Sequence, residues 1–325
     1  MEPTSNSPRL ISVIIPANNE MDSLEDLNVV LEFLNNQAAN GGEFRFEFLI
    51  IDNASIDQTW QVLNALFGKR EHIRLLKNTL DVGLQRSILK GLIACKGDAA
   101  VVLQSDLQDP PELILTMIDL WSHGALYVST KIVKRNSSFL DRWTRTFGYV
   151  FLNFLAGVKI ESNSGDFWLI DRSVIQQLVV NTSLRPFFRT AIPRIMPPDA
   201  LLEYERNPRS RGKSNFNFMG KYEFFIDALL SDARKFSMFM FMTALTIFSV
   251  SFVELIIALP ILLSNPPERV HHFASIFCVL GVVGFVVSLI LFPITLITEN
   301  IQRIYSDQAN LVSEKTHLEK ARRNQ

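Results

Sequence analysis

The chain has 325 residues, which suits one large domain or one domain with a membrane appendage. Its formal net charge of -1 argues against a nucleic-acid-binding protein, which would need a broad basic face. The only two cysteines, Cys95 and Cys278, are far apart and indicate neither a disulfide framework nor a cysteine metal site. Residues 1–9 are polar and lack the apolar stretch of a secretory signal, so we expect a flexible terminus followed by a cytosolic domain.

Residues 10–130 alternate between strand-like and helix-like patterns. The predicted elements, in chain order, are strands at 10–15, 46–51, 73–76 and 99–104, with helices at 20–36, 58–67 and 84–95 and another after Pro110 and Pro111. This alternation implies an α/β fold with a mainly parallel sheet covered by helices on both faces. Ligands bind such sheets at the carboxyl ends of the strands.

Polar residues gather at three of these strand ends, in Asn18 to Glu20, Asp52 to Ser55 and Gln104 to Asp109. A lone aspartate after a strand is usually a helix N-cap, and Asp52 and Asp106 are both compatible with that reading. Their joint placement favours a nucleotide site, with acceptors for base and ribose and oxygen ligands for Mg²⁺ or Mn²⁺ beside a diphosphate.

The third cluster, Gln104 to Asp109, has acidic and amide side chains at alternate positions. On extended backbone, the alternating Asp106 and Gln108 would turn their oxygens to one side. Asp109 is then a further ligand or a helix cap.

Two long apolar stretches, 236–263 and 273–298, follow near the C-terminus, and Glu254 is the only charged residue in them. Crossing the hydrocarbon core takes about 20 apolar residues, so they predict a transmembrane hairpin rather than buried core helices. The loop between them carries a single Arg269, whereas basic residues lie on the outer flanks. The positive-inside rule therefore predicts that both termini, including a tail at 299–325, are cytoplasmic.

Two further segments, 139–154 and 222–236, show apolar residues at helical spacing. Each is compatible with a core-facing stripe or with a helix lying in the membrane interface. We assign 219–235 to an interfacial amphipathic helix between a catalytic domain at 10–218 and the membrane spans.

Several stretches carry a family resemblance. They are Ile11–Glu20, Ile51–Ser55, Ser105–Glu112, Asn163–Phe167 and Arg211–Ser214. In order and spacing they resemble the family 2 inverting glycosyltransferases, more narrowly the polyisoprenyl-phosphate glycosyltransferases such as dolichol-phosphate mannose synthase and bactoprenol glucosyl transferase. The resemblance covers about residues 10–235 and extends to the hairpin and the Arg303-Ile304-Tyr305 run. It implies a GT-A fold, a Rossmann-like sheet.

The resemblance also implies roles for matching residues. The implied nucleotide-sugar site comprises Pro16, Asn18, Glu20, Asp52, Ser55, Gly83 and Gln104. The implied catalytic residues are Asp106, Asp109 and Asp166, with Mg²⁺ or Mn²⁺ on Asp106 and Gln108. The residues expected to grip the acceptor phosphate are Arg135, Arg211 and Lys213.

The chain departs from the family pattern at several positions. Family members usually have Asp at Asn53, Gly at Ala54, Asp at Gln104 and Arg at Trp168. A neutral amide at Gln104 attracts a divalent cation less strongly than a carboxylate does, so weaker metal binding is expected.

The resemblance therefore implies an inverting transfer of a sugar from a nucleotide-sugar to a polyisoprenyl phosphate, and the bacterial members point to UDP-glucose as the donor. The product is a lipid-linked sugar for a cell-envelope glycan, made at the cytoplasmic face of a bacterial inner membrane, and a homo-oligomer is plausible. The alternative is a catalytically weakened or inactive glycosyltransferase-like scaffold. A processive polysaccharide synthase is disfavoured because the chain lacks a Gln-x-x-Arg-Trp run.

Overall fold

The computed structural model describes residues 8–133, 153, 163–181, 186–207, 233–264 and 267–323. The chain divides into two compact units, Met1–Ser231 and Asp232–Gln325, which are described separately. Most of the predicted interfacial segments, 139–154 except residue 153 and 219–232, lie outside the described residues.

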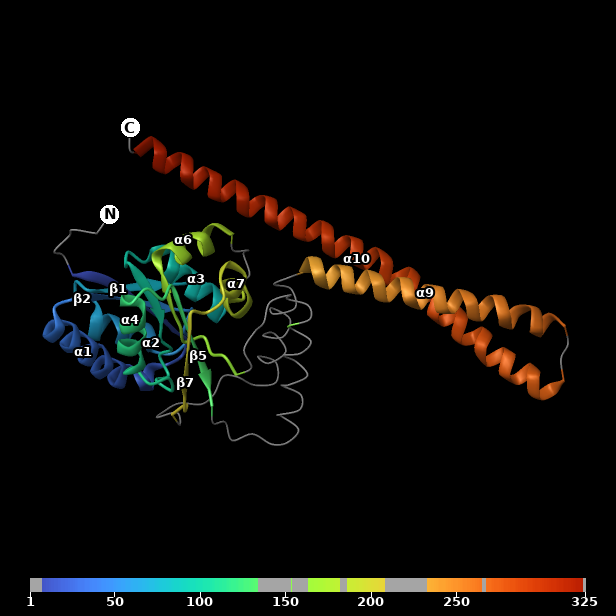
Figure 1. Ribbon diagram of the computed structural model, residues 1–325, viewed down its shortest axis with the longest axis horizontal. Helices are drawn as coiled ribbons and strands as arrows, with labels where there is room; N and C mark the ends of the chain where they lie inside the picture. Colours follow the sequence, from blue (N-terminus) through green and yellow to red (C-terminus); the bar gives the residue numbers. More distant parts are fainter. Residues whose placement is uncertain are drawn as a thin grey trace. The chain divides into compact units, whose positions relative to one another are not determined.

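The first unit is built on one seven-stranded sheet (Figure 1). Its strands are β1 (Arg9–Ala17), β2 (Phe44–Asp52), β3 (Ile73–Lys77), β4 (Ala99–Val102), β5 (Tyr127–Ile132), β6 (Leu169–Asp171) and β7 (Ala200–Tyr204). Their order is β3-β2-β1-β4-β6-β5-β7, and only β6 runs antiparallel to its neighbours. The predicted α/β fold with a mainly parallel, GT-A-like sheet is confirmed.

Helices cover both faces of the sheet. They are α1 (Leu24–Gly41), α2 (Thr59–Phe67), α3 (Leu84–Ala94), α4 (Leu113–Ser122), α6 (Arg172–Asn181) and α7 (Phe188–Ile195), with a 3₁₀ turn at Met21–Ser23. Alternate side chains of β1 point to opposite faces. Val13 and Ile15 pack in the core with α1, α2 and α4, whereas Ile14 packs with α3, α6 and α7. Burial on both faces explains why β1 is apolar along most of its length and does not alternate between apolar and polar residues.

The direction of β6 determines what meets at the functional edge. Because β6 runs against β4 and β5, its first residue lies at the edge where β1, β2, β4, β5 and β7 end. Asp166, just before β6, therefore belongs to the same edge as the polar residues that follow the parallel strands. Ligand sites of open α/β sheets occupy this edge.

The second unit is a pair of packed helices, α9 (Ala233–Leu263) and α10 (Glu268–Arg323) (Figure 1). Their stretches Ser237–Leu263 and Glu268–Ile297 are long and apolar enough to cross a membrane. The predicted spans lie in these helices, and α10 continues through most of the predicted tail.

Small residues let α9 and α10 approach closely. A Cβ added to Gly284 would clash with Ser251 Oγ, and Ser237 Oγ donates to the carbonyl of Thr295 at 3.0 Å. Such contacts are typical of membrane helix pairs. Many large apolar side chains are exposed; Phe252 and Phe277, for example, each expose 50 % of their surface. This exposed apolar surface fits a lipid environment.

Candidate active site

Asp52 closes β2 and is completely buried. Its Oδ1 accepts the N–H of Ser55 at 3.2 Å, whereas its buried Oδ2 has no hydrogen-bond partner in the part of the chain that the structure describes. Helix α2 starts at Thr59 with Gln58 as its N-cap, so the capping reading of Asp52 is wrong. Because an unpaired buried acceptor is unfavourable, Oδ2 is placed to take a donor group from a ligand.

The loops after β1 and β2 are tied together. Asn18 Nδ2 donates to the carbonyl of Asn53 at 2.7 Å, and the N–H of Asn19 donates to Ser55 Oγ at 2.9 Å. Asn19 has a positive φ of 54°, an uncommon backbone conformation that often marks functional sites. These bonds bring the predicted residues Asn18, Glu20, Asp52 and Ser55 into one region.

Asn53 links this region to the loop between β3 and α3. Its Nδ2 donates to Asp81 Oδ1 at 2.5 Å, while its Oδ1 accepts from Asn78 Nδ2 and from the N–H of Val82, both at 3.0 Å. Gly83, the residue before α3, also donates its N–H to Asp81 Oδ1 at 2.9 Å. Gly83 has a φ of 81°, which suits glycine, and it presents the N-terminus of α3 at the functional edge. The sequence prediction named Gly83 but missed Asn78 and Asp81.

The loop after β4 turns sharply. Leu107 has a φ of 51°, and its N–H donates to the carbonyl of Gln104 at 3.2 Å. The expectation of extended backbone from Asp106 to Gln108 is therefore wrong, because a turn begins at Gln104. Asp106 Oδ1 accepts the N–H of Gln108 at 3.3 Å inside this turn, and α4 has Glu112 as its N-cap, so Asp106 does not cap that helix.

The same loop is attached to β1. Ser105 Oγ donates to the carbonyl of Pro16 at 3.0 Å. Pro16 lies in β1 beyond the last residue of its pairing with β4, so its missing N–H costs no ladder bond on that side. This contact places the predicted residues Pro16, Gln104 and Asp106 close together.

Asp109 is the centre of a buried polar cluster. It is 2 % exposed, and its Oδ1 accepts from the Tyr204 hydroxyl at 2.5 Å and from Arg206 Nε at 3.0 Å. Burial raises the pKa of Asp109, and the neighbouring Arg206 guanidinium opposes that rise. Arg206 Nη2 also donates to Gln104 Oε1 at 3.3 Å. The sequence prediction missed Tyr204 and Arg206, which close and follow β7, the last strand of the sheet.

Asp166 is 2 % exposed and paired with Arg189 of α7. Arg189 Nε donates to Asp166 Oδ1 at 3.2 Å, and its Nη2 donates to Oδ2 at 3.0 Å. Such a bidentate pair fixes the orientation of the carboxylate. A carboxylate held in this way is better suited to orienting a substrate than to abstracting a proton.

Trp168, at the position where family members usually have arginine, points into the core. It is 2 % exposed, and its ring centroid lies 5.8 Å from that of Phe188. Its buried Nε1 has no partner within the described ranges. Arg189, which follows Phe188 in α7, instead supplies the positive charge next to Asp166.

Comparison with known proteins assigns the chain to a family. The model of the family described as Glycosyl transferase family 2 matches residues 12–179, more than half of the chain. The chain belongs to glycosyl transferase family 2. It is a glycosyltransferase with the GT-A type of sheet.

Relatives of this glycosyltransferase include proteins of bacteria and their phages. Bactoprenol glucosyl transferase of Shigella phage SfX is 30% identical over 209 residues, 64% of this chain and 67% of that protein. Putative glycosyltransferase CsbB of Bacillus subtilis (strain 168) is 25% identical over 296 residues, 91% of this chain and 88% of that protein.

Solved structures are more distant. Glucosyl-3-phosphoglycerate synthase from Mycobacterium tuberculosis, in complex with Mn²⁺, UDP and phosphoglyceric acid, has 18% sequence identity and a TM-score of 0.49. The match covers 70% of this chain and 78% of that chain.

The residues present do not fit a metal site held by several protein carboxylates. No group of three or more His, Cys, Asp or Glu side chains is placed to hold a metal ion among the residues whose positions the structure describes. Gln104 Oε1 accepts from Arg206, and Asp109 is held by Tyr204 and Arg206. The assignment of a divalent cation to Asp106 and Gln108 stays a prediction.

The predicted acceptor residues Arg135, Arg211 and Lys213 lie outside the described residues. No geometry for the acceptor phosphate follows from the structure.

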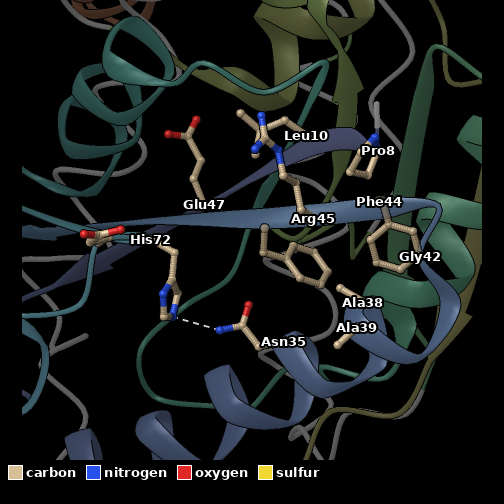
Figure 2. A pocket seen from close by; sticks show the side chains of 12 residues that line it. Pro8, Leu10, Asn35, Ala38, Ala39, Gly42, Phe44, Arg45, Glu47 and His72 are labelled. Atoms are coloured by element: carbon tan, nitrogen blue, oxygen red, sulfur yellow. Dashed lines mark hydrogen bonds between the residues drawn. The ribbon is translucent and has the colours of Figure 1, made fainter. Parts of the chain in front are cut away.

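A surface hollow at the opposite edge of the sheet is not part of this site. Figure 2 shows residues from the starts of β1 and β2, such as Leu10 and Arg45, together with Asn35 of α1 and His72. Asn35 Nδ2 lies 2.8 Å from His72 Nε2, and burial and the nearby Arg70 lower the pKa of His72. The polar clusters named above lie at the other ends of these strands.

Proposed function

We propose that this glycosyltransferase transfers a sugar, with inversion at the anomeric carbon, from a nucleotide-sugar to a polyisoprenyl phosphate. UDP-glucose is the first donor to test. The observation that carries the proposal is the 30% identity to a bactoprenol glucosyl transferase in a chain that also has two helices long enough to span a membrane. Bactoprenol is a polyisoprenol, and a lipid acceptor explains why a sugar-transferring domain is joined to membrane helices.

The donor half of the site would act by holding the nucleotide. Asp52 Oδ2 is a buried acceptor without a partner in the described structure, which suits an N–H of the base or a hydroxyl of the ribose. The N-terminus of α3, beginning after Gly83, offers backbone N–H groups as further donors to the nucleoside. Together they would fix the donor at the carboxyl ends of β2 and β3.

The chemical step needs alignment more than base catalysis. A lipid phosphate is already ionised at neutral pH, so its oxygen attacks the anomeric carbon without first losing a proton. The rate gain then comes from orientation and from stabilising charge on the departing diphosphate. Asp166, fixed by Arg189, would orient the sugar or the acceptor.

The membrane helices would keep the site at the lipid headgroups. Basic residues flank the spans on their outer sides, while the connecting loop carries only Arg269. By the positive-inside rule, both termini and the catalytic domain lie in the cytoplasm. The bacterial and phage relatives point to an inner membrane.

The decisive experiment is transfer of radiolabelled sugar from a panel of nucleotide-sugars to undecaprenyl phosphate, using the full chain in detergent with Mg²⁺ or Mn²⁺. A lipid-linked product is expected. Asp106→Ala is the control, because Asp106 is the predicted catalytic and metal-binding residue, and it should lower the rate by about a hundredfold or more. No product with any donor, from folded protein, would favour the inactive scaffold instead.

A further inference from the structure

Arg206 lies beside Gln104, the position where family 2 members usually have an aspartate two residues before the one that corresponds to Asp106. Its Nη2 lies 3.3 Å from Gln104 Oε1, and its Nε lies 3.0 Å from Asp109 Oδ1. Gln104 follows β4, and Arg206 follows β7, so two separate strand ends bring the cation and the amide together. The guanidinium therefore lies at the loop to which the resemblance assigns the donor diphosphate.

The buried acid keeps this cation in place. Asp109 is 2 % exposed and takes hydrogen bonds from both Arg206 and Tyr204, which fixes one edge of the guanidinium. The Arg206 side chain stays 23% exposed. Its Nη1 has no hydrogen-bond partner within the described chain, so two N–H donors remain for a ligand.

The amide at Gln104 changes the charge that this loop presents. A carboxylate at that position would add a negative charge beside Asp106, and a divalent cation would be needed to offset both. Gln104 is neutral, and its neighbour Arg206 carries a permanent positive charge. Phosphate oxygens are well matched by the fork of an arginine side chain.

We propose that Arg206 is a resident cation for the diphosphate of the donor, so that a nucleoside diphosphate binds this chain without a divalent metal ion. The inference rests on the proposed function, because it assumes a nucleotide-sugar donor. It adds a binding residue from the end of β7 to a site that the sequence placed on the first four strands.

A purely structural role for Arg206 is the competing explanation. The ion pair with Asp109 would then serve only to neutralise a buried carboxylate. That explanation accounts for the bonds from Nε and Nη2 to Asp109 but not for the further bond from Nη2 to Gln104. It predicts no effect on nucleotide binding in a variant that folds.

The test measures binding of UDP and GDP to the full chain in detergent, by calorimetry, with EDTA and then with Mn²⁺. Binding in EDTA is expected, with less than about a threefold gain from Mn²⁺, since the arginine already supplies the charge. Arg206→Gln should weaken binding in EDTA by about tenfold or more, the effect of losing hydrogen bonds from a charged group. Arg70→Gln is the matched control, because Arg70 also pairs with an acid, Glu32, but lies outside the site.

Two further variants keep the result interpretable. Arg206→Gln with Asp109→Asn leaves no unpaired buried charge, so it separates folding from binding; if this folded variant binds UDP in EDTA as wild type does, the inference is overturned. Gln104→Asp should gain dependence on Mn²⁺, seen as tighter UDP binding with Mn²⁺ than with EDTA in the same calorimetry. Wild-type binding that requires Mn²⁺ overturns the inference alone, whereas failure to bind either nucleotide under both conditions counts against the proposed function as well.

Discussion

Two strand-end loops replace a family aspartate by an amide, and they use the amide differently. In the loop after β2, Asn53 donates to Asp81 and accepts from Asn78 and Val82. In the loop after β4, Gln104 uses its side-chain oxygen, which accepts from Arg206. A carboxylate at position 104 could still accept a hydrogen bond from Arg206. A carboxylate at position 53 could not donate a hydrogen bond to Asp81.

The two loops show that the same kind of substitution, from aspartate to an amide, can have different structural reasons. Asn53 is required by its neighbours, since Asp81 already supplies the negative charge and needs a donor opposite it. Gln104 is not required by its contact with Arg206; its effect is on the charge beside Asp106 and Arg206. The first substitution is therefore explained by packing of the β3–α3 loop and the second by the proposed binding of a diphosphate.

The largest effect is expected at the β4 loop when its cation is removed. Arg206→Gln leaves Asp109 buried without its ion pair, which should lower the free energy of unfolding by about 3–5 kcal/mol. Urea unfolding of the full chain in detergent measures it. All four tryptophans lie between residues 60 and 168, so their fluorescence reports on the sheet-bearing unit. A loss no larger than that of the exposed-pair control Arg70→Gln would mean that Asp109 does not depend on Arg206.

A smaller loss is expected at the β2 loop. Asn53→Asp removes the donor to Asp81 and places a second carboxylate beside it, which should cost about 2 kcal/mol of unfolding free energy. Adding Asp81→Asn should recover about half, because the new amide can donate to the carboxylate introduced at position 53.

Gln104→Asp is the comparison variant, since it also replaces an amide by a carboxylate, here beside an arginine and with a side chain one methylene shorter. Its expected change in unfolding free energy is within about 0.5 kcal/mol. Equal losses for Asn53→Asp and Gln104→Asp would remove the distinction between the two loops.

The pH dependence of stability should separate the loops further. Burial raises the pKa of Asp109 above its ordinary 3.8, and Arg206 is the largest opposing cause. In Arg206→Gln the folded-state pKa rises further above the unfolded value. The protonated form of Asp109 then adds to the free energy of unfolding. This contribution is fully present below the unfolded-state pKa of 3.8 and is lost as the pH rises through the folded-state pKa. The gap in unfolding free energy between wild type and Arg206→Gln should therefore widen as the pH rises above 3.8, by at most about 1.4 kcal/mol per pH unit.

The double variant with Asp109→Asn provides the control for this effect. It has no acid left to titrate at position 109, so its gap to wild type should show less of the widening. A gap in Arg206→Gln that stays constant with pH would mean that Asp109 does not change its protonation in this range.

The sequence predicted the first half of the fold well, for a physical reason. β1, β2 and β4 are largely apolar and buried on both faces, and the helices between the first four strands carry clear amphipathic spacing, so local pattern and tertiary packing agree. β6 has only three residues, and four of the five residues of β7 are partly or fully exposed, so neither has a pattern that identifies it. The reversed direction of β6 is set by its partners and not by its own residues.

The residues of the candidate site also divide into those that the sequence predicted and those that it missed. Asp52 and Asp106 were predicted together because parallel strands end at one edge of a sheet. Arg189 and Arg206 were missed because their acids, Asp166 and Asp109, lie 23 and 97 residues away in sequence. A long-range ion pair of this kind leaves no local signal. The expected extended backbone at Asp106 failed because the positive φ of Leu107 is not what a leucine predicts.

The smallest expected effect concerns Ala54, whose φ is 54° in the β2 loop. Family members usually have glycine here, and an alanine side chain in the left-handed region costs roughly 1–2 kcal/mol. Ala54→Gly should therefore stabilise the unit by up to about 1 kcal/mol, since the greater freedom of glycine in the unfolded chain offsets part of the relief. Urea unfolding checks it, with Ala17→Gly in β1 as a control that should destabilise. Destabilisation by Ala54→Gly would mean that the β2 loop gains more from the methyl group than it loses in backbone strain.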